Sequence, residues 1–138
     1  MKKLYSLGTS NRTQEEFLNI LKKFHIQQII DVRRFPTSKF EHFKKENLAD
    51  LLEKEGVKYL WWGKELGGYR KEGYLNYICT QEFKRYLKEL EELAKNKITC
   101  IICCERLYFK CHRRYITQSL KGKLKIIHII EENKVKED

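Results

Sequence analysis

Short apolar runs alternate with amphipathic segments along nearly the whole chain. Five runs have the length of buried strands, and we predict strands at residues 3–7, 26–32, 57–61, 98–103 and 124–130. Between them, apolar side chains recur at helical spacing in segments that begin near Thr13, Lys44, Thr80 and Cys111. Alternation of strand and helix is typical of a parallel sheet with helices on both faces. We therefore predict a three-layer α/β/α fold with a mostly parallel sheet of about five strands, either Rossmann-like or flavodoxin-like.

Local capping signals mark the ends of several predicted helices. Thr13 is followed three residues later by Glu16, which is the pattern of a capping box. Thr80 stands just before another helical segment, where a threonine can cap the first turn. Gly56 and Gly122 each follow the last apolar position of a helix, as glycines at helix C-termini do. Residues 62–79 are rich in glycine and predict one long loop.

The chain has the size of one ordinary domain. It has 138 residues, one proline, no internal repeat and no Gly/Ser-rich linker. We expect residues 1–130 to form a single α/β domain and the charged residues 131–138 to form a C-terminal tail that frays. No stretch approaches the roughly 20 apolar residues of a membrane span, and the start lacks the features of a signal peptide. The sequence therefore predicts a cytoplasmic protein that does not associate with membranes.

The charge balance is strongly basic. The formal net charge is +10 and the sequence pI is near 9.4. Such an excess favours anionic partners, either nucleic acid or an anionic small molecule such as a nucleotide or a phosphorylated metabolite. The alternative is a lysine-rich solvated surface, because the lysines are spread over the whole chain together with many glutamates. The sequence leaves the oligomeric state open.

Strand-to-helix loops in such a sheet share one edge, and open parallel sheets bind ligands at that carboxyl edge. The first of these loops carries Ser10, Asn11 and Arg12 ahead of a helix. Backbone N–H groups and the dipole at a helix N-terminus favour an anion. The loop has neither a Walker sequence nor a Gly-x-Gly-x-x-Gly motif. An ordinary capped turn is therefore the alternative interpretation.

The second loop follows Asp31 at the end of a buried strand. An acid in that position is costly unless it is paired, and Arg33 points to the same side of the strand. The two residues are either part of the functional site or a structural ion pair.

The third loop contains Gly67 and Gly68, a short distance after Trp61 and Trp62. Adjacent glycines allow the backbone to approach a ligand closely or to move as a lid. The tryptophans can wall a pocket or stack on a base. A glycine-rich surface loop with a core tryptophan is the alternative.

The fourth loop concentrates the reactive side chains, namely Cys103, Glu105, Cys111, His112 and Arg113. Cys111 is predicted at a helix N-terminus beside two arginines, and both features lower the pKa of a thiol. His112 can accept or donate a proton near neutral pH. The alternative for Cys103 is a small buried core residue, which is a common role for a free cysteine.

We interpret all five cysteines as thiols. Their odd number and the lack of a secretion signal argue against a disulfide framework. A zinc site is not predicted, because no second cluster of ligands accompanies the cysteines and the histidine of the fourth loop. We expect no metal and no cofactor.

Taken together, the loops resemble the motifs of a widespread bacterial and archaeal family, domain of unknown function family 488. The matching segments are residues 8–12 (Gly-Thr-Ser-Asn-Arg), 31–36 (Asp-Val-Arg-Arg-Phe-Pro), 65–68 (Glu-Leu-Gly-Gly), 103–105 (Cys-Cys-Glu) and 111–113 (Cys-His-Arg). The resemblance covers almost the full chain and implies a three-layer α/β fold, but it supplies no activity. The chain departs from the pattern at Leu107-Tyr108, where many members carry Asp-Pro.

A more distant likeness is to the rhodanese-type sulfurtransferases, which also place Asp-Val-Arg at one strand end and a cysteine at another. Their active loop, like that of cysteine phosphatases, needs an arginine after four or five intervening residues. No arginine stands at that spacing from Cys103 or Cys104. A standard sulfurtransferase or phosphatase is therefore not predicted, and the likeness remains an analogy.

Our first hypothesis is an enzyme acting on an anionic substrate, a nucleotide or nucleic acid, at the carboxyl edge. Its substrate-binding residues are Ser10, Asn11, Arg12, Arg33, Gly67, Gly68 and Arg113. Its catalytic residues are Asp31, Cys103, Glu105, Cys111 and His112. The alternatives are a nucleic-acid-binding module without catalysis, a distant sulfurtransferase-like thiol enzyme, and a scaffold. We expect one pocket to contain Ser10, Asn11, Arg12, Asp31, Arg33, Glu105 and Arg113.

Overall fold

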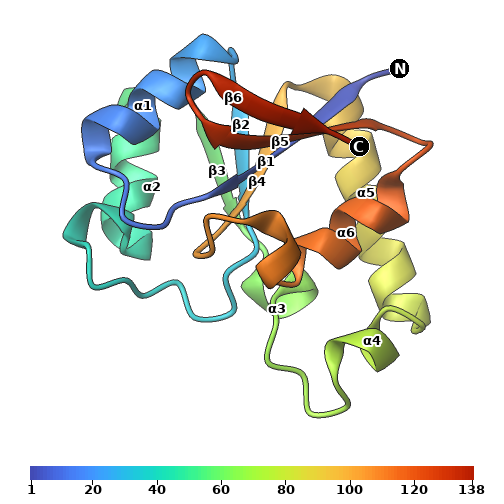
Figure 1. Cartoon of the computed structure of the whole chain (residues 1–138). Coiled ribbons are helices and arrows are strands. Elements are labelled where there is room, and N and C mark those ends of the chain that lie inside the picture. The colour runs from blue at the N-terminus through green and yellow to red at the C-terminus, as the bar shows by residue number, and fades with distance from the viewer.

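A six-stranded sheet lies between two layers of helices in the computed structural model, which describes all 138 residues (Figure 1). The strands are β1 (Lys3–Gly8), β2 (Gln28–Asp31), β3 (Lys58–Trp61), β4 (Thr99–Cys103), β5 (Lys125–Glu131) and β6 (Lys134–Glu137). The main helices are α1 (Gln14–Lys23), α2 (Lys45–Lys54), α5 (Gln81–Asn96) and α6 (Arg113–Leu120). The short ones are η1 (Glu41–Phe43), α3 (Gly63–Leu66), α4 (Tyr74–Tyr77) and η2 (Tyr108–Lys110). The predicted three-layer α/β class is confirmed.

The strand order is β3-β2-β4-β1-β5-β6, and only the last pair, β5 and β6, is antiparallel. This order differs from both the 3-2-1-4-5-6 order of the Rossmann fold and the 2-1-3-4-5 order of flavodoxin. The difference arises because β4 lies between β1 and β2 and pairs with both of them.

Each face of the sheet buries its own hydrophobic core. On one face, α1 and α2 pack through residues such as Phe17 and Leu48 against alternate strand positions. On the other face, α5 and α6 pack through residues such as Leu90 and Ile116. The central strand β4 is buried along its whole length, as its almost continuous apolar sequence predicts, and β1 is buried from Leu4 onward.

The local helix signals are confirmed. Thr13 and Glu16 form a complete capping box at the start of α1, and the Thr80 hydroxyl accepts a hydrogen bond from the Phe83 N–H at the start of α5. Gly56 and Gly122 both have positive φ, the conformation in which glycine ends a helix without strain.

Two segments differ from the sequence-based expectation. The predicted loop 62–79 contains the single-turn helices α3 and α4. Residues 131–138 are more than a tail, because Lys134–Glu137 pair with β5 as the edge strand β6. The sheet therefore has six strands, and the ordered part of the domain extends past residue 130. No helix is both long and apolar enough to cross a membrane.

The position of β4 determines where crevices open at the carboxyl edge of the sheet. The chain leaves β1 and β2 toward the face covered by α1 and α2, whereas it leaves β4 toward the face covered by α6. Adjacent strands whose connections leave toward opposite faces open a crevice at their carboxyl ends, where α/β proteins bind ligands. The carboxyl end of β4 is therefore flanked by a crevice on each side.

Candidate functional site

Both crevices are present as cavities. The one between the ends of β2 and β4, here called the thiol cavity, has a volume of about 310 Å³. Its walls are formed by Arg33, Arg34, Phe35, Thr37, Gly68, Tyr69, Cys103, Cys104, Glu105, Cys111 and His112. The one between the ends of β1 and β4, here called the Ser10 groove, has a volume of about 810 Å³ and includes Ser10, Asn11, Lys39 and Lys110. The two share Thr37, Cys104 and Glu105, so they form one continuous depression.

Two thiols meet in the thiol cavity. Cys103 is the last residue of β4 and is only 2% exposed, whereas Cys111 is half-buried just before α6. Their sulfur atoms lie 2.8 Å apart. The Cys111 sulfur also accepts a hydrogen bond of 3.3 Å from the backbone N–H of Arg113, the first residue of α6. Cys111 therefore lies next to the N-terminus of α6, in agreement with the position at or near a helix N-terminus that the sequence predicted.

This setting makes the two thiols unequal. The pKa of the Cys111 thiol is lowered to about 6, first by the hydrogen bond from the Cys103 thiol and then by the charge and backbone N–H of Arg113, although burial opposes the shift. The pKa of the Cys103 thiol is raised well above its usual value, first by burial and then by its hydrogen bond to Cys111. The two shifts favour the thiolate at Cys111 and the protonated thiol at Cys103.

His112 presents a neutral imidazole to the same cavity. Its Nε2 atom lies 2.8 Å from the carbonyl oxygen of Val32, so Nε2 carries the hydrogen and donates to that oxygen. Burial lowers the pKa of His112 to about 4, which leaves the ring uncharged at neutral pH. The Nδ1 lone pair is on the side of Gly68 and is free to accept a proton or a hydrogen bond.

The expectation of a single pocket containing all three predicted anion-binding arginines is wrong. Arg12 lines neither of the two cavities, because its guanidinium donates to the carbonyl oxygens of Gly8 and Ile130, each at 2.8 Å. Arg113 is equally buried and donates to the carbonyl oxygen of Glu105 at 2.7 Å. These guanidinium groups bind carbonyl oxygens of the protein itself, and they hold the loops in place.

Asp31 and Arg33 form the ion pair that their spacing predicted. The Asp31 carboxylate accepts from the backbone N–H, Nε and Nη2 of Arg33 and from the hydroxyl of Tyr59 at 2.6 Å. The remaining Nη1 of Arg33 donates to the carbonyl oxygen of Phe43 at 2.6 Å. Both side chains are buried, and Asp31 lines neither cavity.

Cationic and aromatic side chains that face the thiol cavity come from residues next to the predicted site residues in the sequence. Arg34, Phe35 and Tyr69 line the thiol cavity, and the rings of Phe35 and Tyr69 are 61% and 84% exposed with centroids 5.4 Å apart. Cys104 likewise lines the cavity beside buried Cys103. The alternation of side chains past a strand end is the signal that could have identified Arg34 and Cys104, because Arg33 and Cys103 take the buried side.

The glycine pair packs against the protein rather than standing free as a lid. A side chain at Gly67 would collide with the carbonyl oxygen of Gly63 and lie 2.9 Å from the Cα of Arg34. A β-carbon at Gly68 would lie 3.3 Å from Nδ1 of His112. Gly67 therefore allows two backbone segments to pack, and Gly68 leaves the imidazole accessible from the cavity.

The tryptophans serve as supports. The indole N–H of Trp61 donates to the carbonyl oxygen of Arg33 at 2.8 Å, and Trp62 packs on the core covered by α5. Neither lines the thiol cavity or the Ser10 groove.

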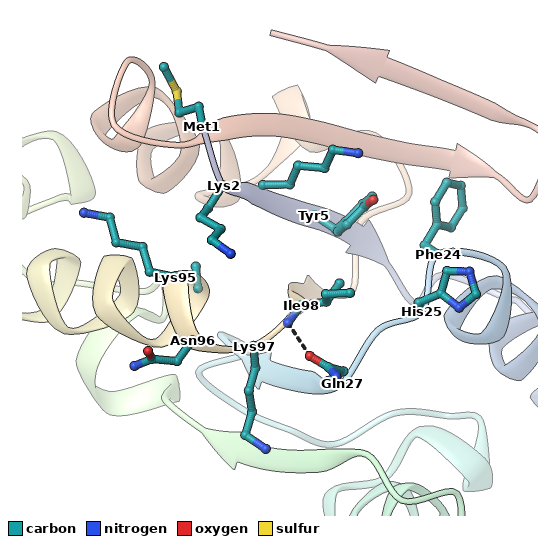
Figure 2. Close-up of a pocket in the computed structure, with 12 residues that line it drawn as sticks. Met1, Lys2, Tyr5, Phe24, His25, Gln27, Lys95, Asn96, Lys97 and Ile98 are labelled. Atoms are coloured by element: carbon teal, nitrogen blue, oxygen red, sulfur yellow. Dashed lines mark hydrogen bonds between the residues drawn. The ribbon is translucent and has the colours of Figure 1, made fainter.

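A separate hollow of about 450 Å³ opens at the amino edge of the sheet, where Lys2, Lys95 and Lys97 surround Ile98 and Gln27 (Figure 2). It has no carboxylate in its wall and contains none of the predicted site residues. α1 and α5 both end next to this hollow, and lysines near helix C-termini complement the helix dipole. Nowhere do three or more His, Cys, Asp or Glu side chains gather as a metal site would require.

Comparison with known proteins agrees with the motifs in the sequence. A search of the curated proteins finds no match. A family model does match, over residues 13–120, which include α1, α6 and the loops that form the thiol cavity. The chain therefore belongs to the family described as domain of unknown function DUF488.

Proposed function

We propose that the protein is a thiol enzyme in which Cys111 attacks an anionic substrate, a nucleotide or nucleic acid, bound in the thiol cavity. The observation that supports this most directly is the Cys111 sulfur, which faces a cavity, lies 2.8 Å from the Cys103 sulfur and accepts a hydrogen bond from the Arg113 N–H. A nucleophilic cysteine needs this combination of a stabilised thiolate and access to a ligand.

The neighbouring groups have separate roles in this proposal. His112 accepts or returns a proton through Nδ1, which is unprotonated because Nε2 donates to Val32. Arg34 binds negative charge on the substrate, since no carboxylate or carbonyl of the protein pairs with its guanidinium. Asp31 and Arg113 lie outside the cavity and position the loops, while Arg33 borders the cavity with its guanidinium bound to Asp31.

Alkylation of the cysteines tests the proposal. Iodoacetamide at a series of pH values, followed by peptide mass spectrometry, measures the reactivity of each thiol. We expect Cys111 to be labelled first, with a half-maximal rate near pH 6, while an ordinary thiol requires a pH near 8.5. Cys79→Ser is the matched control, because Cys79 is exposed and lies outside the cavity. Labelling spread evenly over the exposed cysteines would contradict the proposal.

One observation favours a second candidate, a nucleic-acid-binding module without catalysis. The exposed rings of Phe35 and Tyr69 stand beside Arg34, and such groups stack on bases and bind phosphate in single-stranded nucleic acids. Binding of a labelled oligonucleotide should then fall between about 50 and 200 mM salt and should be lost in the Phe35→Ala/Tyr69→Ala variant. Oligonucleotide binding that persists in Cys111→Ser, with no selective alkylation of Cys111 in the parent, would favour this candidate over the enzyme.

A further inference from the structure

The second thiol has no assigned role in a simple nucleophilic mechanism. Cys103 ends a central strand, is almost fully buried, and has its sulfur 2.8 Å from that of Cys111. A structural cysteine in a core needs only apolar neighbours, as Cys100 has in the same strand. Cys103 instead points its sulfur at the one thiol with a lowered pKa.

We propose that Cys103 resolves adducts on Cys111, so that the site reduces small anionic disulfides and closes a Cys103–Cys111 disulfide. This inference rests on the proposed role of Cys111 as the nucleophile. It adds a reaction class, thiol–disulfide exchange, and a substrate class for the same cavity.

The geometry assigns the order of events. Cys111 is half-buried and reaches the cavity, while Cys103 borders the cavity but is only 2% exposed. Of these two thiols, Cys111 is therefore the one that meets a substrate first. A disulfide bond requires a sulfur–sulfur distance of about 2.0 Å, so the two sulfurs have less than 1 Å to move. The connecting loop contains the single turn η2, and a loop element of this kind can absorb such a movement.

The chemistry balances within the two thiols and the substrate. The Cys111 thiolate attacks one sulfur of the disulfide R–S–S–R, the substrate S–S bond breaks, and R–S⁻ leaves. The Cys103 thiol then attacks the Cys111 sulfur of the mixed disulfide, and the second R–S⁻ leaves with the Cys103 proton as R–SH. The substrate gains two electrons and becomes one thiol and one thiolate. The protein loses two electrons and carries one disulfide.

The charges that face the cavity favour an anionic substrate. Arg34 lies in the cavity wall without an ion-pair partner, and Arg33 is neutralised by Asp31. Glu105 is the one carboxylate in the wall, and it also borders the Ser10 groove with Lys39 and Lys110. The depression therefore carries more positive than negative charge, which suits a disulfide with carboxylate groups better than one with amines.

Oxidised glutathione tests the inference on the reduced full-length protein, with cystamine as the cationic comparison. Intact mass measured without reductant should show a product two hydrogen atoms lighter than the starting protein. Peptide mapping should then join Cys103 to Cys111. In Cys103→Ser the reaction should stop at one glutathionyl group on Cys111, and Cys79→Ser should behave as the parent. We expect glutathione disulfide to react faster than cystamine.

Each of the other outcomes contradicts one part of the proposal. A glutathionyl group that stays on Cys111 in the parent protein contradicts the role of Cys103 but not the role of Cys111 as nucleophile. A disulfide between Cys111 and Cys104 has the same meaning. Faster reaction with cystamine overturns the substrate class. Failure of both disulfides while iodoacetamide still labels Cys111 selectively overturns the exchange reaction alone. Failure of the labelling too overturns the proposed function. Mapping of the parent protein decides the question even where Cys103→Ser does not fold.

Discussion

Replacement of Asp31 by asparagine is expected to be among the most destabilising single changes in this protein. Asp31 is 0% exposed and its carboxylate accepts from three groups of Arg33 and from the Tyr59 hydroxyl. Asparagine keeps the volume but removes the charge and replaces one acceptor oxygen with a donor. The Arg33 guanidinium would then be a buried charge without a counterion.

The magnitude follows from that uncompensated charge. Breaking a buried ion pair by removal of one partner costs about 3–5 kcal/mol. For a domain of this size the urea m-value is about 2 kcal/mol per M, so the unfolding midpoint should fall by about 1.5–2.5 M. The double replacement Asp31→Asn/Arg33→Met should recover part of the loss, because it removes the unpaired charge as well.

Urea unfolding followed by circular dichroism provides the assay. Asp50→Asn is the matched control, since Asp50 is exposed on α2 and makes no ion pair; its effect should stay within about 0.5 kcal/mol. A loss below about 1 kcal/mol for Asp31→Asn would mean that the pair is solvated, and the reasoning from burial would be refuted.

Three further predictions concern the loops and the thiols. Gly67→Ala should lower the free energy of unfolding in urea by about 1–3 kcal/mol, because the added methyl group collides with backbone atoms. Gly68→Ala should fold normally, and it should slow the alkylation of Cys111 because its methyl group covers Nδ1 of His112. Arg12→Met should cost about 2–4 kcal/mol in the same assay, since two carbonyl oxygens lose a charged donor; an unchanged midpoint would show that other groups satisfy them. The pKa of Cys111 is lowered to about 6 in the folded protein, compared with about 8.5 for an ordinary thiol, so folding stabilises the thiolate form. The contribution of this thiolate to the free energy of unfolding should be complete above pH 9, decline between pH 9 and pH 6, and vanish below pH 6. The difference in the free energy of unfolding between the parent and Cys111→Ser should therefore grow from about pH 5 to pH 9. A difference that stays constant with pH would contradict the lowered pKa.

The features that were predictable from the sequence are encoded by neighbouring residues. The helix ends at Thr13, Thr80 and Gly56 depend on contacts within a few residues, and each has the expected conformation. The parallel class follows from the alternation of buried strands and amphipathic helices. The strand order does not, because the insertion of β4 between β1 and β2 depends on pairings across some 70 to 95 residues, such as Gln28 with Thr99 and Gly8 with Cys103.

The candidate site was predictable in its location but not in the roles of its residues. The motif residues do gather at the carboxyl edge, since every strand-to-helix loop ends there. A motif does not reveal whether an arginine is free, because the answer depends on carbonyl groups supplied by distant segments, such as Ile130 for Arg12. The 2.8 Å contact of Cys103 with Cys111 is equally hidden, since it depends on how the intervening loop folds back.

The short strand β6 also protects the molecule in solution. All four of its residues are exposed, and three of them are charged. It covers the edge of β5, whose interior is a nearly continuous run of isoleucines. An uncovered edge of that composition can pair with the same edge of another molecule and grow into aggregates, whereas lysines and glutamates on an outer strand discourage further pairing. Proteolytic trimming of residues 132–138 would therefore first be noticed as a loss of solubility, before any loss of the chemistry at the opposite side of β4.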